Sequence, residues 1–432
     1  MSSDARIDLS RAVDRRMASA REWDSLVEQI RALDGFADFL RPPRLEALLP
    51  AAAHGPIAVV NLSHLRCDAL VVDTGGVRVV ELPGLTIETV VDRTLEYLVV
   101  LRNVDLAAHE VQATWQRYQD GDHAPAAIRE YTGAKLAYQR AVDERDRTLD
   151  ATLAWLWDEI AGPVLTAVGL VDPPVPGQPW PRLWWCPTGP LTLLPLHAAG
   201  HHDGTGRAVL DRVVSSYTPT LRALLEARRQ LDPAPDDERM LIVAVPDAPD
   251  AVPLTDVVRE RDLLTSVFAD RHTLLEGGAA NADAVLTEMS RHRWAHFCCH
   301  GGQDLTDPSR GGLLLRDRTL GIAEISARRH HGEFAFLSAC MTATGGVVLP
   351  DEAITLAAAL HYTGYRRVIG TLWSVYDDTA ADVAATVYAD LTATGRFEPE
   401  RSADALHRAI RELRDVHRLP PSAWTPFTHT GP

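Results

Sequence analysis

The sequence lacks the features that attach a chain to a membrane or to nucleic acid. No run of about 18 uninterrupted apolar residues is present, so we expect no membrane span. Residues 1–16, MSSDARIDLSRAVDRR, are charged throughout and contain no apolar h-region, so we expect no secretory signal peptide. Acidic side chains outnumber basic ones by 59 to 43, for a formal net charge of −16. This balance argues against nonspecific binding to nucleic acid or anionic lipid, which needs clustered Lys and Arg.

Cysteine is also scarce. The five cysteines are scattered and odd in number: Cys67, Cys186, Cys298, Cys299 and Cys340. They make a poor disulfide framework, and no CxxC redox motif is present. A chain of this kind fits a reducing compartment, so we expect a cytoplasmic protein.

No internal repeat with a period of 20–50 residues is present, so we expect no solenoid. The chain has 432 residues, too many for one ordinary core, and we therefore expect two or three domains. Residues 1–170 are predicted as a helical N-terminal region containing a small β-sheet at about 56–84. Proline-rich connectors at 171–181 and 231–238 bound an intermediate segment at about 175–235.

Residues 236–432 show a regular alternation of strand and helix. Continuous apolar strands are predicted in MLIVAVPD, RWAHFCCHG, EFAFLSAC and RRVIGTLW, each followed by a helical or hairpin segment. Such strands indicate an α/β fold with a mostly parallel sheet flanked by helices on both faces. Functional sites in these sheets lie beyond the carboxyl ends of the strands.

Two reactive side chains follow predicted strands directly. His300 ends WAHFCCHG, and Cys340 ends AFLSAC. If these strands are neighbours, an imidazole and a thiol project from the same edge of the sheet. A cysteine nucleophile needs a base, and a histidine can serve as that base and then as the acid for a leaving amine. The backbone amides of Gly301 and Cys340 are candidates for an oxyanion hole.

Two other interpretations of HFCCHGG compete with a catalytic one. A cysteine in an apolar strand is usually a small buried hydrophobe, and this is our interpretation of Cys67, Cys186 and Cys298. Zinc is the second alternative, with His296, Cys298, Cys299 and His300 as candidate ligands. Alternate side chains of a strand face opposite ways, so His296, Cys298 and His300 are expected on one face and Cys299 on the other. No second ligand pair with zinc spacing follows, and we expect neither a metal nor a cofactor.

The ordered set of motifs resembles the CHAT domain family, the caspase-like cysteine peptidases that are also akin to separase. The resemblance rests on HFCCHGGQDLTDPSRGGLLLRDRTLGIAEI, FAFLSACMTATGG, DEAITLAAALHYTGYRRVIGTLWSVYDDTAADV and PSAWTPFTHTG, with LWWCPTGPLTLLPLHAA and VVSSYTPTLRALL upstream. It covers roughly residues 175–432, and more weakly the sheet near 56–84. It implies a caspase-like fold for residues 236–432, with 175–235 as the opening segment of the CHAT region. It also makes residues 1–170 a candidate pseudo-peptidase half.

The resemblance also implies roles for individual residues. The family's catalytic histidine falls on His300 and its nucleophile on Cys340, whereas Met341 stands where the family often has Glu or Gln. An acid in the S1 pocket would favour Arg or Lys at P1, and the candidates are Asp377, Asp304 and Asp351. Each of these acids is equally suited to a helix N-terminus.

The sequence therefore supports three hypotheses. The first is a cytoplasmic cysteine endopeptidase that cleaves a protein substrate as a regulated effector, with an activating or sensor protein supplied by another chain. The second is a catalytically silent, CHAT-like scaffold or peptide-binding module. The third is a zinc-binding interaction module.

Overall fold

The computed structural model describes the chain except residues 1–2, 37–38, 121–124, 230–237, 250, 252, 303–309, 340–341, 343–354 and 376, and the side chains of 3–15 and 377. The chain divides into two compact units, residues 1–50 and residues 51–432. The first unit contains the helices α1 (Ser3–Arg31) and α2 (Leu45–Leu48), as its mixed charged and apolar sequence predicts.

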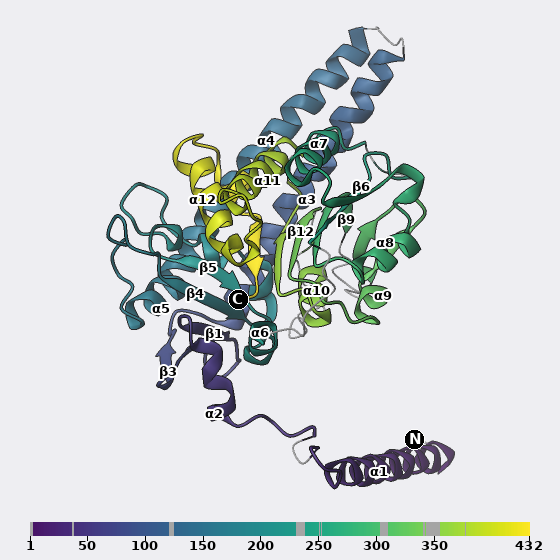
Figure 1. The fold of residues 1–432 in the computed structure, drawn as a ribbon, viewed down its shortest axis with the longest axis vertical. Helices are drawn as coiled ribbons and strands as arrows, with labels where there is room; N and C mark the ends of the chain where they lie inside the picture. The colour runs from purple at the N-terminus through teal and green to yellow at the C-terminus, as the bar shows by residue number, and fades with distance from the viewer. Residues whose placement is uncertain are drawn as a thin grey trace. The chain divides into compact units, whose positions relative to one another are not determined.

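One sheet of eleven strands runs through residues 51–432, in the order β3–β2–β1–β4–β5–β14–β13–β12–β8–β6–β7 (Figure 1). The strands are β1 (Ile57–Asn61), β2 (Asp68–Asp73), β3 (Gly76–Glu81), β4 (Arg182–Pro187), β5 (Val214–Tyr217), β6 (Met240–Ala244), β7 (His272–Glu276), β8 (Trp294–Cys298), β12 (Phe334–Ser338), β13 (Arg367–Thr371) and β14 (Phe427–Thr430). The β1–β2, β2–β3 and β13–β14 pairs are antiparallel and the other pairs are parallel. The predicted mostly parallel sheet is confirmed.

The strands predicted at about 56–84 belong to this same sheet. β1 pairs in parallel with β4, and the ladder continues through β5 to β14. β14 in turn pairs with β13, so strands from the segments 51–84, 182–217 and 240–430 belong to one hydrogen-bonded sheet.

Helices cover both faces of the sheet, as the continuous apolar strands require. One core contains side chains of α7, α11 and α12, and the other contains side chains of α8, α9 and α10. The helices of this unit are α3 (Ile87–Gln119), α4 (Pro125–Leu156), α5 (Gly162–Ala167), α6 (Leu221–Arg228), α7 (Val257–Phe268), α8 (Ala282–Met289), α9 (Ile322–Ser326), α10 (Leu356–Thr363), α11 (Asp377–Leu391), α12 (Ser402–Asp415) and α13 (Pro421–Trp424).

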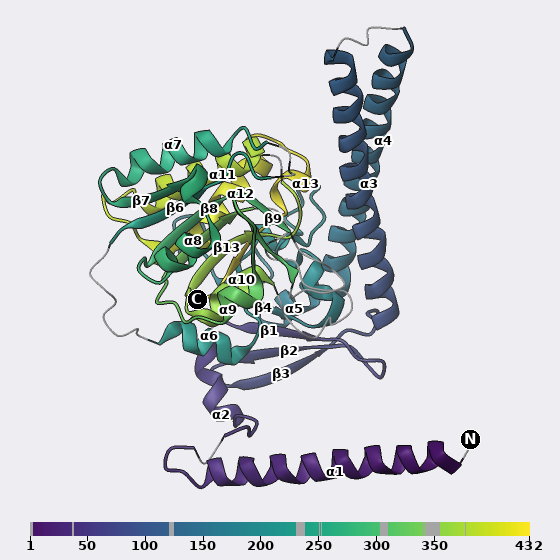
Figure 2. The same cartoon turned by 90° about the vertical axis from the view of Figure 1, so that its right-hand side faces the viewer.

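The long helices α3 and α4 lie side by side and project from the sheet region of this unit (Figure 2). Both helices begin at residues that commonly start helices. The Thr86 hydroxyl oxygen caps α3 by accepting a hydrogen bond from the Thr89 amide, and Pro125 is the first residue of α4. No helix in the part of the chain that the structure describes is long and apolar enough to cross a membrane.

A second sheet of three short strands follows β8 directly. It consists of β9 (His300–Gly302), β10 (Gly312–Leu314) and β11 (Thr319–Gly321), all antiparallel. The chain bends at Cys299 between β8 and β9, so the predicted single strand RWAHFCCHG is two strands. The predicted hairpin near 311–320 is confirmed as β10 and β11.

Candidate active site

His300 lies where the chain leaves the large sheet at the carboxyl end of β8. The register pairs Cys298, the last residue of β8, with Ala244 at the end of β6 and with Ser338 at the end of β12. These three strands therefore end at one level, and His300 begins β9 two residues past that level. The sequence-based expectation that His300 follows a strand at the carboxyl edge is confirmed for this residue.

A cavity of about 30 Å³ lies beside His300. Its lining comes from the ends of three parallel strands and from α7 and α11: Leu254, Asp256, Val257, Glu260, Cys299, His300, Ser338, Ala339, Thr371, Val375 and Ala380. This volume holds about two water molecules and is too small for a peptide side chain. Cys299 and His300 both line it, so strict alternation does not continue across the bend at Cys299.

The candidate nucleophile Cys340 and its neighbour Met341 lie outside the described residues, but the residues on either side are placed. The Thr371 hydroxyl donates to the Ala339 carbonyl at 2.8 Å, and the Thr371 amide donates to the Thr342 hydroxyl oxygen at 3.0 Å. Thr342 is 1 % exposed, and its carbonyl accepts the Ala357 amide of α10 at 2.9 Å. The chain is thus anchored to β13 both before and after Cys340.

The structure places the remaining predicted site residues only in part. Gly301 lies in β9 opposite Leu313, and its role in an oxyanion hole stays a prediction. Asp304 and Asp351 lie outside the described residues. Asp377 is the first residue of α11, with its side chain outside the description, and the flanking residues Val375 and Ala380 line the cavity.

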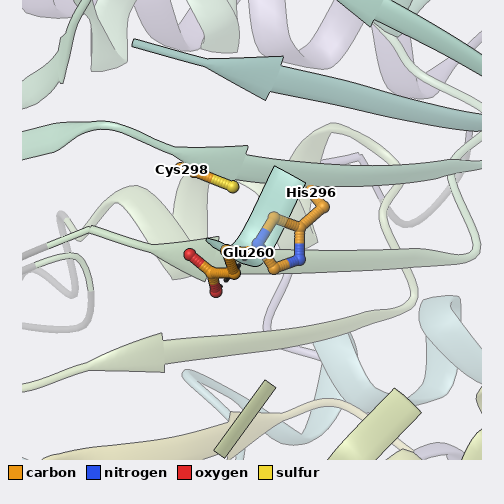
Figure 3. Close-up of side chains that lie close together, drawn as sticks. All are labelled: Glu260, His296 and Cys298. Atoms are coloured by element: carbon orange, nitrogen blue, oxygen red, sulfur yellow. Dashed lines mark hydrogen bonds and ion pairs between the residues drawn. The ribbon is translucent and has the colours of Figure 1, made fainter. Parts of the chain in front are cut away.

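Three side chains gather beneath the cavity in a buried cluster that we call the Glu260 cluster: Glu260, His296 and Cys298 (Figure 3). The His296 ring lies between two partners, with its Nε2 3.2 Å from Glu260 Oε1 and its Nδ1 2.9 Å from the Tyr388 hydroxyl. His296 and Cys298 have no exposed surface, and Glu260 is 3 % exposed. Burial, together with the Glu260 carboxylate, raises the pKa of the Cys298 thiol well above its usual range. Cys298 is therefore a protonated packing residue and not a nucleophile.

The Glu260 cluster also offers a chemically reasonable set of metal ligands. One ligand atom from each residue lies within 4.8 Å of the others, and imidazole, thiolate and carboxylate are all zinc ligands. This set differs from the four zinc ligands considered from sequence, because Glu260 joins it, whereas Cys299 packs in the opposite core. The three groups hydrogen-bond one another and Tyr388, so the cluster is satisfied by the protein's own atoms.

Sequence reasoning did not identify Asp256, Glu260, Thr342, Thr371 or Tyr388 as residues of this region. Glu260 and Tyr388 lie 36 and 92 residues from His296, and no local pattern links residues so far apart. The one available signal was position, because Asp256 and Glu260 lie in the segment that follows the carboxyl end of β6.

The comparisons with known proteins agree with this arrangement. A model of the CHAT domain matches residues 150–432. Among solved structures, the Saccharomyces cerevisiae separase–securin complex superposes with a TM-score of 0.57 at 9 % identity, covering 90 % of this chain and 31 % of that one. A second structure of the same complex gives a TM-score of 0.55 and covers 89 % of this chain and 30 % of that one. The chain thus spans less than a third of the separase chain.

Gingipain R (RgpB) of Porphyromonas gingivalis is also similar, with a TM-score of 0.37 at 10 % identity over 66 % of this chain and 67 % of that one. No curated protein sequence matches the chain. At this identity the two separase structures show the fold alone, a mostly parallel sheet flanked by helices.

Proposed function

This chain belongs to the CHAT domain family, and we propose that it is a cysteine endopeptidase in which Cys340 is the nucleophile and His300 is the general base and acid. In this proposal residues 236–432 form the peptidase domain, and residues 1–170 form an N-terminal region that serves regulation. The protein acts in the cytoplasm, in keeping with four described cysteines that are all free and buried.

The observation that carries the proposal is the register of β8 and β12. Ser338 pairs with Cys298, and the chain continues for two residues from each to reach Cys340 and His300. A thiol and an imidazole that leave adjacent parallel strands at the same level are suited to meet beyond the sheet edge. Ala339 and Thr342, the described residues on either side of Cys340 and Met341, are both hydrogen-bonded to Thr371, and fixed flanking residues suit a catalytic position.

The proposed chemistry is acyl transfer. His300 takes the proton from the Cys340 thiol, and the thiolate attacks the carbonyl carbon of the scissile peptide bond. The backbone amides of Gly301 and Cys340 donate hydrogen bonds to the oxyanion that develops. His300 then gives its proton to the leaving amine, and water hydrolyses the thioester.

A protein partner fits this proposal. The similar separase structure is that of a complex with securin, so a chain of this fold can be held by another protein. We propose that this chain cleaves a protein substrate and is regulated by an activating or sensor protein. The small cavity beside His300 supports regulation, because a substrate side chain needs more room than about 30 Å³.

An electrophilic activity probe tests the assignment. Peptidyl acyloxymethyl ketones with different P1 residues are incubated with the wild type, Cys340→Ala and His300→Ala, and the labelled residue is identified by mass spectrometry. We expect labelling of Cys340 in the wild type and at least a 100-fold slower rate in His300→Ala. Cys298→Ala is the matched control, and its labelling should equal that of the wild type.

Equal labelling of Cys340→Ala and wild type would show that another residue is the nucleophile. A wild type that binds the peptide part of the probe without ever labelling Cys340 would support the catalytically silent, peptide-binding alternative.

A further inference from the structure

Three arginines form a cluster outside the cavity beside His300: two lie against the Trp184 ring, and the third, Arg367, interacts electrostatically with one of them. We call Arg182, Arg228 and Arg367 the arginine cluster. Arg367 is the first residue of β13, and Thr371 at the other end of that strand lines the cavity beside His300. Arg182 begins β4, and Arg228 ends α6. The cluster is therefore assembled from three separate elements and lies apart from the candidate active site.

Trp184 and Gly431 connect the members of the cluster. The guanidinium carbons of Arg182 and Arg228 lie 4.6 and 4.7 Å from the centre of the Trp184 ring. The Trp184 indole donates to the Gly431 carbonyl at 2.8 Å. A Cβ at Gly431 would lie 3.3 Å from the Arg367 Cα, so the backbone of Arg367 is close to the residue that Trp184 contacts.

The guanidinium groups of the cluster have donors without acceptors. Nε of Arg182, Nε and Nη2 of Arg228, and Nε and Nη1 of Arg367 are buried and have no hydrogen-bond partner in the part of the chain that the structure describes. The bonds that the cluster does make go to neutral groups, from Arg182 to the Ser216 hydroxyl and from Arg228 to the Ala51 carbonyl. Within the described residues, none of the three arginines forms an ion pair.

The electrostatics agree with this geometry. Burial lowers the pKa of Arg367 to about 10, with Arg366 adding to the effect, and burial and then Arg182 lower the pKa of Arg228 to about 10. The nearest acids act only at a distance, Asp404 on Arg182 and Glu333 and Glu400 on Arg367. The cluster is therefore a concentrated positive potential in a chain whose net charge is −16.

An arrangement like this is costly without a counter-ion. A buried charge that lacks a partner destabilises the folded state, and buried donors are nearly always satisfied in native proteins. Arg367 is only 9 % exposed, so water from bulk solvent does not compensate it fully. An anion that accepts hydrogen bonds from these free donors would supply the missing acceptors and compensate the buried charge.

We propose that the arginine cluster is a binding site for a phosphate group, either inorganic phosphate or the terminal phosphate of a nucleotide. Guanidinium forks match phosphate oxygens with paired hydrogen bonds, and three cations suit a dianion better than a monovalent carboxylate. Trp184 is 1 % exposed, so its ring leaves no face for a stacked base. The site therefore recognises the phosphate group and not the nucleobase.

Titration calorimetry and thermal unfolding of the full chain test the site. Inorganic phosphate, ATP and acetate are added separately at constant ionic strength, with chloride as the background anion. We expect saturable phosphate binding and a rise in the unfolding midpoint of the wild type. The dissociation constant should rise at least 10-fold in Arg228→Met and Arg367→Met. Arg318→Met removes an exposed guanidinium paired with Glu324 and should bind phosphate like the wild type.

The variants also separate binding from folding. In phosphate-free buffer Arg367→Met should be at least as stable as the wild type, because it removes a buried charge without a partner. If Arg367→Met does not fold, phosphate binding is compared between the wild type and Arg228→Met, since Arg228 is only half-buried. ATP binding tighter than phosphate would identify a nucleotide as the source, and equal binding would identify the free anion. Acetate binding as tight as that of phosphate, or an unchanged phosphate affinity in both arginine variants, would overturn the proposal.

Discussion

The Thr371 amide donates a hydrogen bond to the Thr342 hydroxyl oxygen at 3.0 Å, which joins the end of β13 to the chain just past Cys340. The Thr371 hydroxyl reaches back to Ala339 on the other side of Cys340 at 2.8 Å. One threonine thus fixes both ends of a short connection that carries the proposed nucleophile. Positioning of this kind is a large part of catalysis, because a displacement of about 1 Å costs about 100-fold in rate.

Replacing Thr342 by valine removes the acceptor of the Thr371 amide while keeping the side-chain volume. The buried amide is then unsatisfied, and we expect a loss of about 1–3 kcal/mol in the free energy of unfolding. We also expect Cys340 to react with the electrophilic probe about 10- to 100-fold more slowly. Thr363→Val is the control, since it removes a buried hydroxyl that bonds only its own helix. A normal labelling rate in Thr342→Val would mean that this anchor does not position Cys340.

Two buried tyrosines test the hydrogen bonds of the Glu260 cluster, Tyr388 as a member of the network and Tyr365 as the control. The Tyr388 hydroxyl bonds His296 Nδ1 at 2.9 Å, whereas the equally buried Tyr365 hydroxyl has no partner among the described residues. Tyr388→Phe therefore leaves a ring nitrogen unsatisfied, and we expect it to cost about 1–3 kcal/mol in urea unfolding. Tyr365→Phe removes an unsatisfied group and should be neutral or stabilising. Equal costs for the two substitutions would contradict this hydrogen-bond network.

Stability should fall in acid because several histidines are buried. Burial lowers the pKa of His407 to about 3, with Arg411 and Arg414 adding to the effect, and lowers the pKa of His197 and His361 to about 4. The unfolded imidazoles titrate near 6.5, so between that pH and the folded pKa the unfolded state binds more protons. The free energy of unfolding should therefore decrease as the pH falls from 6.5 towards 4, by about 1.4 kcal/mol per pH unit for each such histidine. Urea unfolding of His407→Gln should show a shallower pH dependence, and an unchanged slope would contradict this role.

If the proposed peptidase has an acid in its S1 pocket, a comparison of Asp256 with Asp377 tests two candidates for it. The Asp256 side chain lines the cavity beside His300, whereas Asp377 begins α11 in the segment that borders it. If the proposed peptidase prefers Arg or Lys at P1, Asp256→Asn should reduce that preference by about 10-fold or more, as measured with a positional-scanning peptide library. An unchanged preference in Asp256→Asn together with a loss in Asp377→Asn would assign the role to Asp377. Indifference of the wild type to Arg and Lys would remove both.

Sequence patterns predicted the strands that are apolar on both faces, because a continuous apolar run within one segment is enough to indicate such a strand. MLIVA of β6, FAFLS of β12 and RVIGT of β13 are each buried almost throughout, and each was expected as a strand. β5 (VSSY) and β14 (FTHT) were not expected, because polar residues fill several of their buried positions. The structure explains them, since His429 of β14 bonds Ser216 of β5 on one side and Ser402 on the other.

The residues of the candidate site also differ in whether the sequence could predict them. The position of His300 followed from one strand and one rule about sheet edges, and sequence was sufficient for it. The roles of Glu260, Thr342 and the arginine cluster come from contacts between segments many residues apart. A pattern within one segment cannot predict such contacts. The roles of Cys340, Met341, Asp304 and Asp351 stay predictions.

The place of β14 in the sheet has a consequence for how the protein is made. β5 ends at Tyr217 and β14 begins at Phe427, yet the two pair directly, and β14 also pairs with β13. At about 5–20 residues per second, a ribosome needs roughly 10–40 s to make the chain between them. During that time β5 presents an unpaired edge, and β13 does so from its own synthesis until β14 is made. The central ladder of the sheet can close only after every other strand has been synthesised, so a nascent chain cannot complete the framework of its site early.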